Sequence, residues 1–333
     1  MELFTRLSHT LQEFDATILN LLVFGSVDAC VAGTEAMRRV FGKIDWPMTW
    51  VEGAGCGEHP IAGVHVFALS GSNVRRVSVN NRVLASVFDD GAARYCHVGG
   101  LGPTRPSQSR AGQTQEALDR LEQTLAEAGF SLRDMARTWF FLDDILAWYR
   151  EFNHVRTKAY SRVKFNTGSL PASTGVSGRN PERSALALAA WAIQPANSST
   201  EVREVASPLQ CPAPAYGSSF SRAMEISSSS GRRLFISGTA SIAPEGQTLW
   251  PDNAAKQVDL SMQVIDAILR SRGFTFADLT HATAYFKNSS SVPAFTAWCS
   301  ANKLPQSIVV PALCDICRDD LLFELEAEAW KSV

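Results

Sequence analysis

The chain has 333 residues, a hydrophobic fraction of 45% and a formal net charge of -2, so it is long enough for two or three compact units and has no charge excess to attract nucleic acid or an anionic membrane. It contains no run of about 18 apolar residues, and its polar, acidic start does not resemble a secretion signal. Its seven cysteines are scattered and odd in number, which favours a reducing cytoplasm over a disulfide framework.

Residues 1–90 give the weakest pattern in the chain. The glycine-rich stretch 53–60 predicts a loop, residues 63–71 predict a strand, and residues 77–88 predict a hairpin. We treat this N-terminal segment as a candidate for a degenerate third unit beside the two that follow.

The remainder of the chain carries one order of elements twice: a strand, a helix ending in Gly-Phe, a strand, a helix and a closing strand. In the first copy these elements are expected at residues 94–102, 113–129, 136–142, 145–160 and 185–191. In the second copy they are expected at residues 233–242, 254–272, 281–286, 292–302 and from 323 onward. An internal repeat of about 100 residues is the strongest organisational signal in the sequence.

The repeat divides the chain into units. We expect one domain at residues 91–195 and a second at 216–333. Residues 196–215, between them, are rich in proline, serine and alanine and are interpreted as a linker.

The last strand of the second copy places three carboxylates on one face. From Phe323 onward apolar and acidic residues alternate, so Glu324, Glu326 and Glu328 point away from the apolar face. Such a row of carboxylates either faces solvent or serves a function, and the strand pattern by itself favours solvent.

The second copy resembles the YjgF/RidA family. The resemblance is carried by Ser237-Gly238, Gly273-Phe274, the strand 281–286 and the closing strand that begins at Phe323. It implies an α+β fold of tandem chorismate-mutase-like units, each a curved mixed sheet backed by helices. Members of this family form trimers with ligand sites between neighbouring units, so the tandem implies a pseudo-trimeric monomer or a homo-oligomer.

The resemblance also distinguishes the two copies. Glu324 falls where the family keeps an active-site glutamate, whereas the first copy has Ala187 and Leu188 in its closing strand. Imine-hydrolysing members carry an arginine after the proline-alanine that precedes the final strand. Residues 307–313 contain no arginine here, which disfavours, without excluding, an imine deaminase.

A degenerate unit followed by an intact one resembles the chorismatase family, which hydrolyses chorismate. The segments that carry this closer resemblance are 136–139, 148–156, 170–175, 216–223 and 317–324. The resemblance implies release of pyruvate and, in one branch of the family, formation of 3-hydroxybenzoate. A hydrolase that stops at a dihydroxycyclohexadiene carboxylate, a 4-hydroxybenzoate product and a non-catalytic small-ligand-binding protein remain open alternatives.

The chemistry of chorismate suggests roles for individual residues. Cleavage of its enol ether needs a proton at the methylene carbon, so a general acid is required, and Glu324 is the candidate. The two substrate carboxylates need cationic side chains and hydroxyl groups to bind them. The candidates in the matching segments are Arg137, Arg156, Arg222, Tyr149 and Tyr216.

Two further residues are assigned by the resemblance alone. Cys317, together with Gly238, resembles the hydroxybenzoate-forming branch of the chorismatases.

Cys314 and Cys317 form a C-x-x-C pair without a second ligand pair, so we expect neither a metal nor another cofactor.

Overall fold

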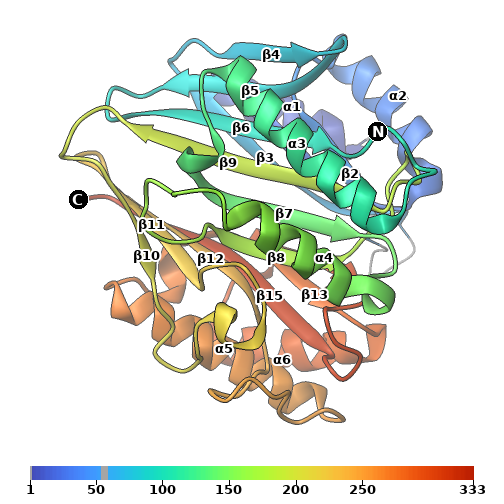
Figure 1. Cartoon of the computed structure of the whole chain (residues 1–333), viewed down its shortest axis with the longest axis vertical. Helices are drawn as coiled ribbons and strands as arrows, with labels where there is room; N and C mark the ends of the chain where they lie inside the picture. Colours follow the sequence, from blue (N-terminus) through green and yellow to red (C-terminus); the bar gives the residue numbers. More distant parts are fainter. Residues whose placement is uncertain (1, 54–58) are drawn as a thin grey trace.

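The computed structural model describes residues 2–53 and 59–333, and these residues form three β-sheets with helices packed on their outer faces (Figure 1). The expected loop at 53–60 lies mostly outside the described residues. The strand orders are β2-β1-β3 in one sheet, β4-β5-β6-β9-β7-β8 in the second and β10-β11-β12-β15-β13-β14 in the third. The predicted class, tandem α+β units with mixed sheets backed by helices, is confirmed.

The middle sheet belongs to the first copy of the repeat. Its strands are β4 (Arg75–Val79), β5 (Arg82–Asp89), β6 (Ala93–Leu101), β7 (Met135–Leu142), β8 (Ala172–Ser177) and β9 (Leu186–Pro195). Helices α3 (Arg110–Ala128) and α4 (Ile145–Tyr160) cover its outer face (Figure 1). Helix α3 begins at Ser109, whose side chain accepts a hydrogen bond from the Gly112 N–H, and ends at Gly129 in the left-handed region (φ +80).

The third sheet repeats this arrangement. Its strands are β10 (Glu201–Val205), β11 (Ala223–Ser227), β12 (Arg232–Ala240), β13 (Leu279–Phe286), β14 (Val309–Leu313) and β15 (Phe323–Lys331). Its helices are α5 (Ala254–Ser271) and α6 (Val292–Asn302). In both sheets the sixth strand lies between the third and the fourth, and the fourth and fifth strands are parallel. The internal repeat read from the sequence is therefore a repeat of topology.

The N-terminal sheet resembles half of such a unit. Its strands are β1 (Ala16–Gly25), β2 (Met48–Val51) and β3 (Ile61–Ser70). Helix α2 (Cys30–Phe41) connects β1 to β2, and α1 (Glu2–Glu13) precedes β1. Strand β1 is parallel to β2 and antiparallel to β3, which reproduces the last three strands of each six-stranded sheet. No helix of the described residues is long and apolar enough to cross a membrane.

Two segments adopt structure that their local sequence did not predict. Strands β4 and β5 form the expected hairpin, with Asn80 and Asn81 at positive φ, but they extend the middle sheet although they precede residue 91. Strand β10 lies inside the segment 196–215, interpreted as a linker, and pairs with β11. Edge strands are short and partly exposed, so a polar composition is compatible with them. The division into domains itself remains a prediction.

The inner faces of the three sheets pack against one another. Phe24 of β1 contacts Phe141 of β7 and Tyr285 of β13, with ring centroids 6.0 and 6.1 Å apart. The acidic face of β15 points into this interface, and Glu324, Glu326 and Glu328 are only 4%, 5% and 2% exposed. The solvent-facing interpretation, which the strand pattern by itself favours, is therefore wrong, because the inner faces of the other two sheets cover this face of β15.

Candidate active site

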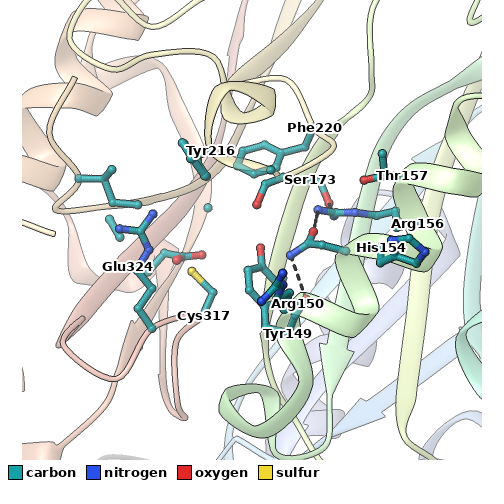
Figure 2. Close-up of a pocket in the computed structure, with 18 of the residues that line it drawn as sticks. Tyr149, Arg150, His154, Arg156, Thr157, Ser173, Tyr216, Phe220, Cys317 and Glu324 are labelled. Carbon is teal, nitrogen blue, oxygen red and sulfur yellow. Dashed lines mark hydrogen bonds between the residues drawn. The ribbon is translucent and has the colours of Figure 1, made fainter. Parts of the chain in front are cut away.

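A cavity of about 530 Å³ lies between the two copies of the repeat (Figure 2). The first copy contributes one face of α4 and the side of β8 that faces this helix. The second copy contributes β12, β15 and the loops around Tyr216 and Cys317. Figure 2 shows Glu324 and Cys317 on one side of the space and Tyr149, Arg156 and Ser173 on the other.

Glu324 is a buried carboxyl group that faces this cavity. The side chain of Glu324 is almost fully buried, with 4% exposure, yet it has no hydrogen-bond or ion-pair partner among the described residues. Burial, and after it the Glu326 carboxylate, raise the pKa of Glu324 to about 8, against the opposing charges of Arg222 and Arg137. The group is therefore protonated at neutral pH and can donate a proton.

Arg156 and Arg222 both reach the cavity from opposite walls. Arg156 is 1% exposed, donates to Asn153 Oδ1 at 2.6 Å, and has a buried Nε without a partner among the residues described. Arg222 donates through Nε and Nη2 to the Cys211 carbonyl at 3.0 and 2.9 Å. Neither arginine forms an ion pair with a described residue, and two buried cations of this kind favour an anionic ligand.

Tyr149, Tyr216 and Cys317 also line the cavity. Burial raises the pKa of both phenols, and it raises the pKa of the Cys317 thiol to about 12. All three are therefore neutral at physiological pH. The tyrosines can donate hydrogen bonds, and Cys317 is a thiol rather than a thiolate.

Gly238 makes room for the acid. A side chain at this position would collide with Glu324 Oε1, because β12 passes directly against the carboxyl group. The structure thus brings Gly238, Cys317 and Glu324 together at one end of the cavity.

Arg137 differs from the other predicted anchors. It is not among the residues that line the cavity, and it forms an ion pair with Glu326 inside the sheet interface. The strand alternation of β7 turns its side chain inward, away from the space where a ligand would bind. The position of Arg137 therefore does not support the predicted direct contact with a ligand.

Several residues that the sequence did not single out also line the cavity. They are Arg150, Asn153, His154, Thr157, Ser173, Ser218, Phe220 and Arg318. Asn153 and Thr157 follow Tyr149 at intervals of four, which places all three on the same face of α4. This helical spacing is a signal that could have identified them.

The equivalent cavity of the first copy has no carboxyl group at the position that corresponds to Glu324. The register equates the two closing strands: Leu101 pairs with Leu188 as Thr239 pairs with Leu325, so Ala187 corresponds to Glu324. Ala187 lines a separate cavity of about 410 Å³ between the N-terminal sheet and the middle sheet. The methyl group of Ala187 cannot transfer a proton, whereas the corresponding position of the second copy carries the carboxyl group of Glu324.

Comparison with known proteins gives two relatives from Streptomyces hygroscopicus. The chain is 26% identical to a protein named 3-hydroxybenzoate synthase, over 71% of this chain and 74% of the relative. It is 24% identical to a protein named chorismatase, over 80% of this chain and 82% of the relative.

The chain also resembles a solved structure and matches a family model. A crystal structure of a chorismatase superposes with a TM-score of 0.68 at 20% identity and covers 94% of this chain and 93% of the other. A family model described as Endoribonuclease L-PSP matches residues 91–190 and 212–329, which is more than half of the chain. The predicted resemblance to chorismatases and to tandem YjgF-like units is confirmed by these similarities.

Proposed function

The chain belongs to the endoribonuclease L-PSP family, and from this premise we propose that it is an enzyme that cleaves the enolpyruvyl ether of chorismate by general-acid catalysis. The observation that carries the proposal is Glu324, a buried carboxyl group without a partner among the described residues, with a pKa of about 8, in a cavity between two arginines. The two relatives named 3-hydroxybenzoate synthase and chorismatase support the choice of substrate.

The substrate matches the chemistry of the cavity. Chorismate is a dianion, and Arg156 and Arg222 offer two cationic anchors on separate walls. Tyr149 and Tyr216 are neutral phenols that can donate hydrogen bonds to a carboxylate or a hydroxyl group. A cavity of about 530 Å³ lies within the usual size range for sites that bind small molecules.

The proposed reaction begins with proton transfer from Glu324 to the methylene carbon of the enolpyruvyl group. The resulting oxocarbenium ion is trapped by water, and the adduct collapses to pyruvate and a dihydroxycyclohexadiene carboxylate. Glu324 regains a proton from the attacking water. A pKa near the working pH suits a group that must give and recover a proton in each turnover.

We further propose that the reaction continues to 3-hydroxybenzoate. The diol aromatises by losing one water molecule, which balances the water added in the previous step. The net conversion of chorismate to pyruvate and hydroxybenzoate therefore consumes no water. Cys317 and Gly238 flank Glu324 at the end of the cavity and are the residues assigned to this branch. The relative named 3-hydroxybenzoate synthase supports the same product.

Incubation of the purified protein with chorismate tests the proposal. We expect one pyruvate for each chorismate consumed, measured by coupling to lactate dehydrogenase, and 3-hydroxybenzoate as the aromatic product by mass spectrometry against standards. Absence of pyruvate above the spontaneous background would overturn the proposed activity. A rise in melting temperature with chorismate but without turnover would instead indicate a binding protein.

A further inference from the structure

Glu326, two residues beyond the acid on the same face of β15, lies at the centre of a buried hydrogen-bond network. Its Oε2 accepts hydrogen bonds from Arg137, from Thr174 and from the Trp139 indole at 2.9 Å. Its Oε1 accepts from Thr283 at 3.0 Å and from the Tyr285 hydroxyl at 2.9 Å. These residues come from both six-stranded sheets, so the network joins the two halves of the candidate active site.

The direction of each hydrogen bond is fixed by the chemistry of the partners. Thr174 gives its single hydroxyl proton to Glu326, so it accepts from Arg137 at 2.6 Å and from the Gly238 N–H at 3.0 Å. Thr283 likewise gives its proton to Glu326 and accepts from His65 Nε2 at 2.8 Å. Both oxygens of Glu326 therefore act only as acceptors, which is the behaviour of an ionised carboxylate.

The network reaches the acid through one backbone group. The Thr174 hydroxyl holds the Gly238 N–H, and Gly238 is the residue whose backbone lies against Glu324 Oε1. Thr174 thus connects the fixed charge of Glu326 to the wall that makes room for the Glu324 carboxyl.

We propose that Glu326 is a positioning residue for the general acid: its fixed negative charge keeps the neighbouring Glu324 protonated, and through Thr174 it holds the β12 backbone in place beside that carboxyl. The role of Glu326 in catalysis rests on the proposed function. The electrostatic coupling between Glu326 and Glu324 can be measured without substrate.

Other charged and titratable groups also face Glu324. Arg137 of β7 and Arg222, which precedes β11, act against the protonated form, while the thiols of Cys314 and Cys317 carry no charge. Arg156 of α4 and Arg318 line the same cavity. Glu326 is the largest charge effect on Glu324 after burial itself, so the balance favours the protonated acid.

Direct titration of Glu324 tests the proposal. Glutamate labelled with ¹³C at the side-chain carboxyl gives one NMR signal for each carboxyl group, and the Glu324 signal is assigned by its loss in Glu324→Gln. In Glu326→Gln we expect the Glu324 pKa to fall by about one unit or more, because a like charge is removed and Arg137 is left unopposed. In Arg137→Gln, which removes the positive charge, we expect it to rise.

Two further variants keep the test decisive. Glu328→Gln is the matched control, since Glu328 is equally buried on the same strand face but is paired with Arg233, and it is expected to leave the Glu324 titration unchanged. If Glu326→Gln fails to fold, the neutral pair Glu326→Gln with Arg137→Gln replaces it and is expected to lower the Glu324 pKa as well.

The outcomes separate this inference from the proposed function. An unchanged Glu324 titration in the Glu326 variants would overturn the positioning role, even if the wild-type protein releases pyruvate. Conversely, the Glu324 pKa could fall in Glu326→Gln and rise in Arg137→Gln while the wild-type protein releases no pyruvate from chorismate. That result would support the electrostatic coupling and overturn the proposed activity. With activity present, the high-pH limit of turnover should move with the titration, which a merely structural role of Glu326 would not produce.

Discussion

The backbone of Gly238 lies so close to the Glu324 carboxyl that no side chain fits between them. The two residues belong to neighbouring strands, β12 and β15, and their contact closes one end of the cavity between the two repeats. The position of the acid is thus set by the absence of a side chain on the adjacent strand.

This contact predicts the effect of a single methyl group. Gly238→Ala should displace the Glu324 carboxyl and lower kcat with chorismate by about tenfold or more, since small displacements of a catalytic group are costly. Gly175→Ala adds a methyl group to the same cavity at ordinary contact distance, 3.8 Å from Tyr149, and should cost much less. Equal losses in the two variants would contradict the steric explanation.

Arg156 should contribute mainly to binding of the anionic substrate. Arg156→Gln keeps hydrogen-bonding capacity but removes the charge, so we expect KM for chorismate to rise by about one to two orders of magnitude. Arg162, exposed just beyond the end of α4, provides the control substitution Arg162→Gln. Steady-state kinetics of both variants makes the comparison, and an unchanged KM in Arg156→Gln would remove Arg156 from the substrate site.

The buried acid should cost stability at high pH. The pKa of Glu324 is about 8 in the folded protein and near 4.5 when the group is solvated, so between these values the folded state holds one more proton than the unfolded state. The free energy of unfolding therefore falls as pH rises through this window, by about 1.4 kcal/mol for each pH unit, and levels off above pH 8.

Glu324→Gln removes this dependence. We expect the difference in melting temperature between Glu324→Gln and the wild-type protein to grow from pH 5 to pH 8, as measured by thermal denaturation. Glu151→Gln changes an exposed carboxyl on α4 and should show no such trend. A difference that stays constant with pH would mean that Glu324 titrates normally.

The thiol of Cys317 should affect the product rather than the first step. Cys317→Ala leaves Glu324 in place, so chorismate consumption should continue while the product shifts from 3-hydroxybenzoate toward the non-aromatic diol. Cys314→Ala is the matched control from the same loop. Chromatography of the products against standards decides, and an unchanged ratio in Cys317→Ala would exclude Cys317 from the aromatisation.

The sequence predicted the parts of this molecule that depend on local pattern. The repeat, the helices and the position of Glu324 follow from spacing and from family resemblance. The role of Arg137 did not follow, because its partner Glu326 is 189 residues away and faces it only after two sheets pack together. The burial of Glu326 and Glu328 was hidden for the same reason, since strand alternation shows which face a side chain takes but not what covers that face.

Longer-range pairing also explains the remaining differences. Strand β10 has the composition of a linker and is a strand because β11 offers it an edge. Residues 1–90 gave little local pattern, yet β1, β2 and β3 complete the inner interface through contacts such as Phe24 with Tyr285. Such contacts depend on tertiary packing, which overrides local propensity.

The most direct test of the proposed mechanism is pyruvate release from chorismate by wild-type protein and by Glu324→Gln, with equal folding checked by circular dichroism and Glu328→Gln as a control from the same strand face. We expect stoichiometric pyruvate from the wild-type and Glu328→Gln proteins and a rate lower by about two to four orders of magnitude in Glu324→Gln. Wild-type turnover in Glu324→Gln would contradict the assignment of Glu324 as the general acid.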